Sequence, residues 1–409
     1  MAAIQSQSNG HESPKFNVLV VGCGIAGLTT AISCRKKGFT VTALEASSSF
    51  SYVGAGIMLS GNVTNVLIGM GLEAEMEACS THMQRVIFLT WDDGKAMTTQ
   101  EYPAHASPAE GGPSWQVHRA DVHTCLLKKA QEVGVTIRMG VLVKNYDWDA
   151  PVVVLEDGTV LNADVMVAAD GYRSPARESL LGRKDEPRHY GFSAYRALIP
   201  SNTLAQHPEL RELIDSNLQS SYCRHVLGYP IRGGQDYNVV YTQPLKRSLG
   251  SKYVTKVDPA EVLEEYKDWD PRVVAFTKHL PKDGVLEWRL CDLNPLEDWV
   301  FPGDMIVLIG DASHAMIPSA AQGAAMGIED GAAIAELHAR ADTEADVPRI
   351  LRTFQNLRKP RCINVVENGT RDARSWHDKK DPTYKPTSNW VWVYDVKKAS
   401  RDIPLEREA

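Results

Sequence analysis

Three glycines near the N-terminus constrain the fold of this chain more than any other feature. Gly22, Gly24 and Gly27 have the spacing G-x-G-x-x-G, between a short β-branched apolar run and a segment with helical spacing. A second apolar run, residues 39–44, follows and ends in Glu45. This order predicts a strand–helix–strand unit. The first glycine permits the tight turn, the second lets the backbone approach a pyrophosphate, and the third lets helix and strand pack closely.

The acid at the end of the second predicted strand strengthens this interpretation. Glu45 is placed to accept hydrogen bonds from a ribose, while the free N–H groups at the helix start suit the phosphates. A glycine-rich turn in an ordinary α/β protein is the alternative, but it leaves Glu45 without a role. The pattern therefore predicts dinucleotide binding, although by itself it does not separate NAD from FAD.

Composition excludes several other classes of protein. A net charge of −7 over 409 residues argues against a nucleic-acid partner. No apolar run approaches the roughly 20 residues that span a bilayer, so no membrane span is expected. Residues 1–15 are polar and lack the apolar core of a signal peptide, which predicts a disordered tail. Seven scattered cysteines without C-x-x-C spacing favour a reduced, cytoplasmic protein with no metal site.

The character of the sequence changes twice along the chain. Residues 16–185 and 286–370 carry the buried-strand and helix patterns of an α/β domain. Residues 186–285 instead alternate apolar and polar side chains between prolines and glycines, which is typical of an antiparallel sheet with one face on a cavity. We therefore expect an α/β fold: a discontinuous Rossmann-like domain, an inserted, mainly antiparallel β-sheet domain for substrate, C-terminal helices, and a C-terminal extension at 371–409.

Four further signals stand at predicted element boundaries. Each alone has an ordinary explanation, such as a plain turn or a solvated surface arginine. They are Ala55 with Gly56 after the ribose acid, Arg119 at the start of a helix, Ala169-Asp170-Gly171-Tyr172-Arg173 after a buried strand, and Gly310-Asp311 followed by Gln322-Gly323-Ala324.

In this order the motifs resemble those of the single-component FAD-dependent aromatic hydroxylases, the class of p-hydroxybenzoate and salicylate hydroxylases. The resemblance runs from residue 16 to about residue 395 and is nearest to the fungal salicylate-hydroxylase-like enzymes of secondary metabolism. It implies a monooxygenase that uses NAD(P)H and O₂ to hydroxylate a phenolic or other electron-rich aromatic small molecule, through a flavin C4a-hydroperoxide. The Rossmann-like part would then be an FAD-binding domain.

The resemblance also implies where non-covalently bound FAD lies. Gly22, Gly24 and Gly27 would hold its pyrophosphate, Glu45 its adenosine ribose, and Arg119 the phosphate–ribityl side. The remaining cofactor contacts that the resemblance implies are Asp311 at a ribityl hydroxyl, the N–H groups of Gly323 and Ala324 at the flavin N1–C2=O edge, Ala55 and Gly56 beside the ring, and Pro318 at the oxygen-reaction face.

The nicotinamide donor has no domain of its own in this sequence. NADPH or NADH would dock transiently, and Asp170 and Arg173 would lie in the cleft that it shares with the flavin. His314, which follows Gly-Asp-Ala-Ser, is predicted to orient its loop rather than to transfer protons.

Two residues of the inserted sheet are predicted to act on the substrate. Arg196 is a charge in an otherwise apolar strand, and Tyr229 lies in the next predicted strand. By resemblance to fungal phenol hydroxylases they would hold a substrate oxyanion, a task that suits the fork geometry of a guanidinium. A salt bridge or a surface position is the alternative for Arg196. Weaker candidates for the same pocket are Tyr195, His225 and Tyr237.

Other functions remain open at this point. The same flavin chemistry could epoxidise or hydroxylate an indole or alkene, and a flavoprotein oxidase or reductase would insert no oxygen. A catalytically idle FAD-binding scaffold is a further alternative. The sequence does not choose between NADPH and NADH, between a monomer and a homodimer, or among aromatic substrates.

Overall fold

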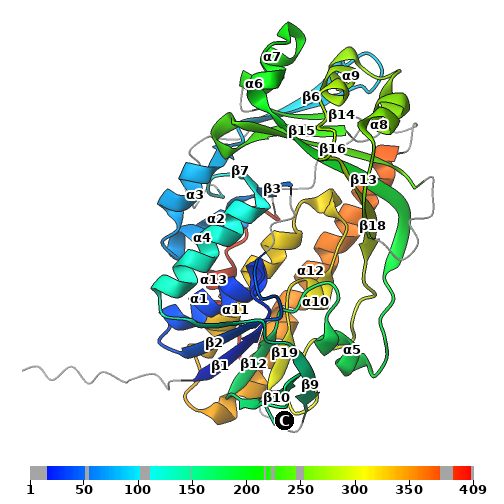
Figure 1. The fold of residues 1–409 in the computed structure, drawn as a ribbon. Helices are drawn as coiled ribbons and strands as arrows, with labels where there is room; N and C mark the ends of the chain where they lie inside the picture. Colours follow the sequence, from blue (N-terminus) through cyan, green and yellow to red (C-terminus); the bar gives the residue numbers. More distant parts are fainter. Residues whose placement is uncertain are drawn as a thin grey trace, which may run out of the picture.

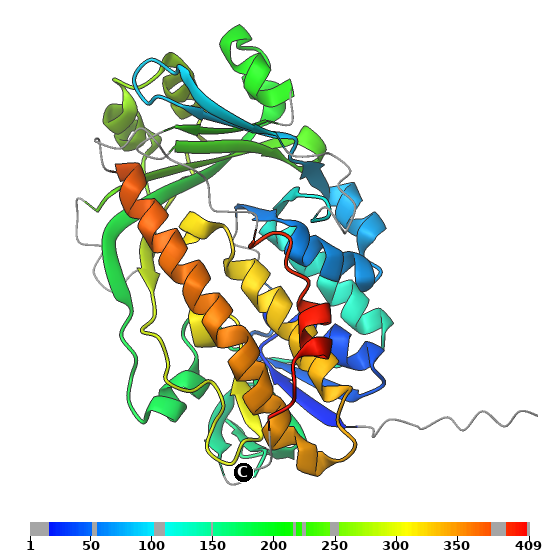
Figure 2. The same ribbon diagram turned by 180° about the vertical axis from the view of Figure 1, so that it is seen from behind.

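The computed structural model describes residues 16–50, 55–101, 111–148, 150–215, 218–222, 226–245, 253–377 and 390–406. The predicted tail, the candidate His225 and part of the predicted C-terminal extension lie outside these residues. Within them the chain forms two large sheets, two small ones and a long helix that runs between the two ends of the molecule (Figure 1, Figure 2).

A five-stranded parallel sheet forms the core of the first half. Its strands, in spatial order, are β19 (Ile306–Leu308), β12 (Val165–Ala168), β1 (Asn17–Val21), β2 (Thr40–Glu45) and β8 (Thr136–Met139). Helices α1 (Ile25–Lys36), α4 (Arg119–Glu132) and α11 (Gly323–His338) cover it. The strands of a parallel sheet covered on both faces are apolar throughout, which is the pattern that predicted β1 and β12. The predicted strand–helix–strand unit is β1–α1–β2.

An eight-stranded, mainly antiparallel sheet forms the second half. Its strands, in spatial order, are β17 (Val254–Lys256), β18 (Leu286–Asp292), β13 (Arg188–Pro200), β16 (Asp236–Pro244), β15 (Val226–Ile231), β14 (Leu218–Tyr222), β5 (Arg85–Leu89) and β6 (Ala96–Glu101). Four helices pack on its outer face: α6 (Ser201–Leu204), α7 (Pro208–Asp215), α8 (Pro259–Tyr266) and α9 (Pro271–Lys278). This packing gives the second half a hydrophobic core of its own.

The remaining elements are two small sheets and further helices. The small sheets are β3 (Gly56–Leu59), β7 (Trp115–His118) and β4 (Ser80–His82), and β11 (Val160–Asn162), β10 (Val152–Leu155) and β9 (Val143–Asp147). The other helices are α2 (Gly61–Gly69), α3 (Glu73–Cys79), α5 (Pro175–Leu181), α10 (Asp311–His314), α12 (Val347–His377) and α13 (Val396–Asp402). Among the described residues, no helix combines the length and the apolar character that crossing a membrane needs.

Two segments belong to the eight-stranded sheet, although the predicted domain boundaries placed them in the Rossmann-like part. The hairpin β5–β6, placed within 16–185, pairs through β5 with β14 in the eight-stranded sheet. Strand β18, placed at the start of 286–370, pairs with β13 in that sheet. Both pairings join residues about a hundred or more positions apart, which local patterns do not reveal. The division of the chain into domains otherwise stays a prediction.

Candidate active site

A cavity of about 600 Å³ lies between the eight-stranded sheet and the parallel half of the molecule. Segments far apart in sequence line it, and they include most of the predicted site residues. Those in the lining are Gly56, Arg119, Arg196, Tyr229, Asp311, Pro318, Gly323 and Ala324. Ala55 lies next to it, because its carbonyl accepts a hydrogen bond of 3.2 Å from the N–H of Arg119.

The glycine loop at the start of α1 shows why each of its glycines is needed. Gly22 has a φ of +101°, and a Cβ on it would lie 2.4 Å from the carbonyl oxygen of Ala169. A Cβ on Gly27 would lie 1.9 Å from the carbonyl oxygen of Gly22. A Cβ on Gly24 would meet no described atom within 4 Å. The protein's own packing therefore requires two of the glycines, and the third leaves open space at a helix N-terminus, as a pyrophosphate needs.

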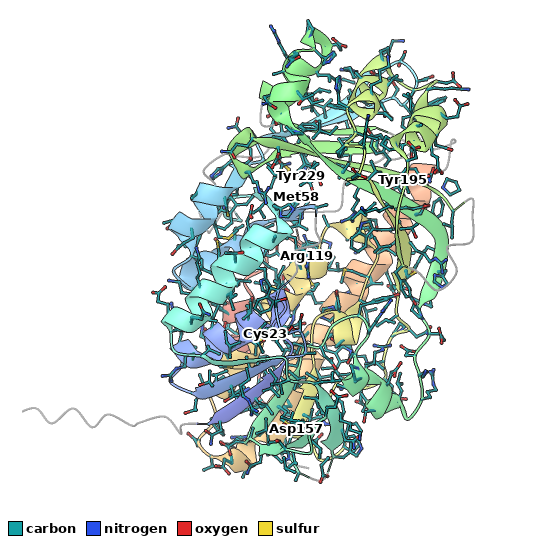
Figure 3. The ribbon with its side chains drawn as sticks, viewed as in Figure 1. Cys23, Met58, Arg119, Asp157, Tyr195 and Tyr229 are labelled. Atoms are coloured by element: carbon teal, nitrogen blue, oxygen red, sulfur yellow. The ribbon has the colours of Figure 1, made fainter. Side chains whose placement is uncertain are left out.

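Glu45 ends β2 directly beside this loop. One carboxylate oxygen accepts a hydrogen bond of 3.0 Å from the N–H of Cys23, and the other accepts one of 2.9 Å from the N–H of Ser47. These bonds hold the carboxylate at the tip of the strand, where the ribose contact is predicted. Figure 3 places Arg119 between Cys23 in the loop and two residues farther along, Met58 on β3 and Tyr229 on β15 of the eight-stranded sheet. This order suits a dinucleotide whose ring system lies at the end away from the glycine loop.

A ring of buried hydrogen bonds joins the two segments that border the cavity near its centre. The Gln322 side-chain amide donates to Ser60 Oγ at 3.0 Å, and Ser60 donates to Asn62 Oδ1 at 2.8 Å. Asn62 closes the ring by donating to Gln322 Oε1 at 3.1 Å, and it also donates to the buried Glu329 at 2.6 Å. The ring fixes the end of β3 against the start of α11, whose first residue is Gly323. The free N–H groups there suit a developing negative charge.

Arg196 reaches the cavity from the middle of β13. Its Nε is buried and has no hydrogen-bond partner among the described residues, and its guanidinium lies 6.0 Å from the centre of the Trp288 ring. Burial lowers the pKa of Arg196, because the charged form loses its hydration. Burial likewise raises the pKa of Tyr229, and the nearby Arg196 charge offsets part of this rise. The two side chains thus present a cation and a protonated phenol to one cavity.

Asn238 is a site residue that sequence reasoning missed. It is fully buried on β16, and its Oδ1 accepts a hydrogen bond of 2.8 Å from the N–H of Gly56. A Cβ on Gly56 would lie 2.8 Å from the Asn238 amide carbon and 2.9 Å from the Tyr229 hydroxyl. The contact therefore needs a glycine at position 56. An amide within the apolar run Tyr-Asn-Val-Val-Tyr was the available signal.

Asp170 and Arg173 do not line the cavity. The Asp170 carboxylate accepts hydrogen bonds from the Ser174 hydroxyl and from the N–H of Ala176 at 3.0 Å, which stabilises the start of α5. Arg173 is exposed, and its guanidinium lies 5.0 Å from the centre of the Tyr253 ring. The arrangement gives Asp170 a structural role. Contact of either residue with a nicotinamide donor stays a prediction.

Tyr195 and Tyr237 face away from the cavity, contrary to the weaker pocket prediction made for them. Both belong to the second hydrophobic core, and Tyr237 stacks on Phe276 with ring centres 5.0 Å apart. The reason is the alternation of side chains along a strand, which sends Tyr195 to the opposite face from Arg196.

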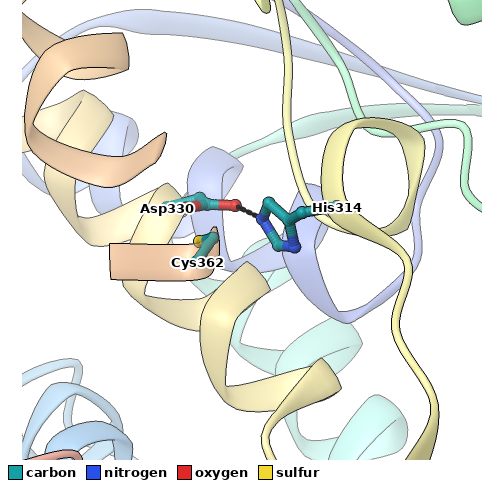
Figure 4. A group of neighbouring side chains, drawn as sticks. All are labelled: His314, Asp330 and Cys362. Atoms are coloured by element: carbon teal, nitrogen blue, oxygen red, sulfur yellow. Dashed lines mark hydrogen bonds and ion pairs between the residues drawn. The ribbon is translucent and has the colours of Figure 1, made fainter. Parts of the chain in front are cut away.

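His314 lies in a buried ion network rather than at the cavity (Figure 4). Its Nε2 is 2.6 Å from Asp330, whose other oxygen accepts a hydrogen bond of 2.8 Å from Arg358. Burial opposes a charge on the imidazole, but Cys362 and Asp330 raise the pKa of His314 well above its usual value. The ligand atoms of His314, Asp330 and Cys362 lie close enough together to hold a metal ion by their spacing alone. The Arg358 guanidinium, which contacts both Asp330 and Cys362, opposes a second cation there.

Comparison with known proteins places this geometry in context. A family model described as an FAD binding domain matches residues 15–369. An FAD-dependent monooxygenase of Arthrinium sp is 31% identical over 366 residues, which are 88% of this chain and 84% of that protein. The 3-hydroxybenzoate 6-hydroxylase 1 of Aquipseudomonas alcaligenes is 30% identical over 352 residues, 85% of this chain and 86% of that protein.

The fold also matches solved structures. A salicylate hydroxylase in complex with its substrate superposes with a TM-score of 0.80 and 24% identity, over 95% of this chain and 98% of that one. These matches confirm the predicted fold class, in which a Rossmann-like FAD-binding part carries an antiparallel sheet and C-terminal helices.

Proposed function

The chain belongs to the FAD-binding-domain family and is an FAD-dependent monooxygenase, and from this premise we propose that it hydroxylates a small aromatic molecule that carries a phenolate or carboxylate. The observation that carries the proposal is Arg196, a half-buried arginine in the wall of the cavity whose buried Nε has no hydrogen-bond partner among the described residues. FAD, reduced by NADPH or NADH, supplies the activated oxygen when it is bound.

The residues present suit FAD. The open space over Gly24 and the helix N-terminus behind it would hold the pyrophosphate, with Glu45 at the adenosine ribose. Arg119 and Asp311 line the cavity between that loop and the sheet, where the ribityl chain is proposed to lie. We therefore assign the far part of the cavity, below Arg196, to the isoalloxazine ring and the substrate.

A partly desolvated guanidinium favours an anionic partner. Among the described residues Arg196 has no ion pair, and an oxyanion in the cavity would compensate its charge. The same attraction lowers the pKa of a bound phenol, so the ring becomes more electron-rich at the moment it must react with oxygen. Tyr229, whose own pKa is raised by burial, stays protonated and can donate its hydrogen bond to that oxyanion. The pair thus binds, orients and activates one ring oxygen.

The experiment compares Arg196→Ala with Arg211→Ala, an exposed arginine on α7 that serves as the matched control. Arg196→Ala should keep FAD but lose hydroxylation, while NAD(P)H oxidation ends in H₂O₂. Loss of a buried charge contact costs on the order of 2–5 kcal/mol, or roughly 30-fold or more in substrate affinity. Arg196→Lys should rescue little, because an ammonium lacks the fork geometry.

The readout is product formed per NAD(P)H consumed, with ¹⁸O₂ and mass spectrometry on a panel of phenols, aromatic acids, indoles and alkenes. Coupling that stays at the wild-type level in Arg196→Ala would show that this arginine is structural. Oxygen transfer only to indoles or alkenes would favour the epoxidase alternative. Flavin oxidation without labelled product from any substrate would favour an oxidase.

We further propose a cytoplasmic protein that acts as a monomer or homodimer and binds no nucleic acid. The six described cysteines form no disulfide, which supports a reducing compartment. The acidic net charge of −7 supports the absence of a nucleic-acid partner.

A further inference from the structure

A second cavity, of about 460 Å³, lies beside the candidate active site. It is bounded by the loop after β18, by α10 and by one face of α12. Arg188, Glu367 and Arg371 in its lining are exposed, so it opens to solvent. A volume in this range suits a single small aromatic molecule.

The two cavities share a wall. Arg188, Tyr190 and Thr370 line both of them. The Tyr190 hydroxyl donates a hydrogen bond of 2.8 Å to Asp292, but it approaches Thr370 Oγ1 only at 3.4 Å. The contact between strand β13 and helix α12 at this point is therefore a long one between two side chains, which can separate without disturbing the backbone.

The chemistry of the second cavity suits an aromatic anion. Its inner wall carries the Trp299 indole together with Ile363 and Val366, beside the imidazole of His314. Two lysine or arginine side chains of its lining hydrogen-bond to neutral oxygens: Lys359 to the Glu297 carbonyl, and Arg371 to the Asn368 amide. These contacts leave both positive charges in place, and the two outnumber the one carboxylate of the lining, that of Glu367. An apolar body with cations near the mouth attracts the class of molecule that Arg196 would bind.

The proposed position of FAD gives such a chamber a purpose. The glycine-loop end of the active-site cavity carries Arg119 and Asp311, and bound FAD would occupy that end. A substrate that enters away from the cofactor would use the other end, where the exposed Arg188 borders both cavities. The wall shared through Tyr190 and Thr370 lies on α12 and β13, away from the glycine loop.

We propose that the second cavity is the entry chamber of the enzyme, through which an aromatic anion reaches the active site by displacing the Tyr190–Thr370 contact. The inference rests on the proposed function for the identity of its ligand. In this proposal Tyr190 controls passage between the two cavities, and the face of α12 around Val366 lines the route.

The test narrows the chamber and measures how fast a ligand enters. Val366 lines the second cavity but not the active site, and Val366→Trp fills the chamber; Asn364→Trp, on the exposed face of the same helix, is the matched control. Salicylate, 3-hydroxybenzoate and neutral phenol are mixed with the FAD-loaded enzyme in a stopped-flow instrument, and the change in flavin absorbance reports binding.

A narrowed route slows entry and exit by the same factor. Val366→Trp should reduce the association and dissociation rate constants of salicylate together, by about tenfold, and leave Kd within about twofold. Tyr190→Phe should raise both rate constants, because it removes the hydroxyl contacts of the gate. Arg371→Glu should slow salicylate but not phenol. Asn364→Trp should behave as wild type.

Each outcome separates the two proposals. A wild-type association rate constant in Val366→Trp would overturn the entry chamber while leaving the proposed function intact, and so would a changed Kd at an unchanged rate. If the wild-type enzyme bound no member of the wider panel of aromatics, the proposed function would fail first. If Val366→Trp loses FAD, Ile363→Phe fills the same cavity from the same helix and repeats the measurement.

Discussion

Exchanging single glycines for alanine should separate FAD binding from folding. Gly24 is the N-cap of α1 with φ −73° and ψ −175°, angles that alanine adopts freely, and an added Cβ meets no described atom within 4 Å. Gly24→Ala should therefore fold with at most about 1 kcal/mol lost at the helix N-cap. The added methyl would occupy the space assigned to the pyrophosphate. Loss of one charge-assisted hydrogen bond costs about 1.5–3 kcal/mol, so the FAD Kd should rise by roughly one to two decades.

Gly27→Ala is the matched comparison, because its damage falls on the protein itself. A Cβ 1.9 Å from the Gly22 oxygen forces α1 away from β1, and overpacking of this kind costs about 1–3 kcal/mol. The assay measures urea unfolding of the cofactor-free protein and FAD affinity by fluorescence titration, for both variants. Gly24→Ala with normal stability and wild-type FAD affinity would refute the assignment of the pyrophosphate to this loop. Wild-type stability in Gly27→Ala would refute the packing argument.

Two further predictions use buried polar groups. Asp170→Asn should cost on the order of 1 kcal/mol of stability, measured by urea unfolding, and leave FAD affinity unchanged, because the carboxylate caps α5 rather than contacting the cavity. A large loss of FAD affinity would instead support its predicted place in the cofactor cleft. Burial lowers the pKa of His338 to about 4, so the unfolded chain binds a proton between pH 6.5 and 4 that the folded protein does not. The free energy of unfolding should therefore fall by on the order of 3 kcal/mol as the pH is lowered through that window. His338→Gln should flatten this part of the curve of stability against pH. An unchanged slope would show that another group titrates there.

The sequence predicted local units well and the joining of distant strands poorly. The β1–α1–β2 unit follows from the apolar run, the glycine spacing and Glu45, all within about thirty residues. Helical spacing predicts one helix over residues 63–79, but the structure has two, because Gly71 takes a φ of +80° between them. The same kind of pattern predicts one helix over residues 259–281, and the structure breaks it at Asp270-Pro271. The parallel pairing of β5 with β14 depends on tertiary packing, and no local pattern encodes it.

The candidate site shows the same division. Motif spacing located Gly323 and Ala324, and the structure brings them to the same cavity as Gly56 and Arg196. The hydrogen-bond ring of Ser60, Asn62 and Gln322 could not be predicted, since all three are ordinary polar residues and Gln322 lies about 260 positions from the other two. Arg173 was assigned to the cleft by resemblance; its guanidinium lies near the Tyr253 ring, outside the lining of the cavity, and its contact with a nicotinamide donor stays a prediction. Motifs therefore predicted which backbone segments meet, but not the side chains that hold them together.

The cavity wall itself follows one rule that links sequence to substrate choice. Side chains alternate between the two faces of a strand, so the face to which one side chain points also fixes the faces of its neighbours. Tyr195 and Ala197 belong to the second core, whereas Arg196 between them lines the cavity. The same alternation holds on the neighbouring strands, where the residues that line the cavity are Leu227, Tyr229, Val240 and Thr242, and those in the second core are Val226, Val239 and Tyr241. One charged residue in an apolar strand thus identifies a complete cavity-facing surface. Substitutions on that surface can change substrate preference while the core behind it, and hence the fold, stays intact.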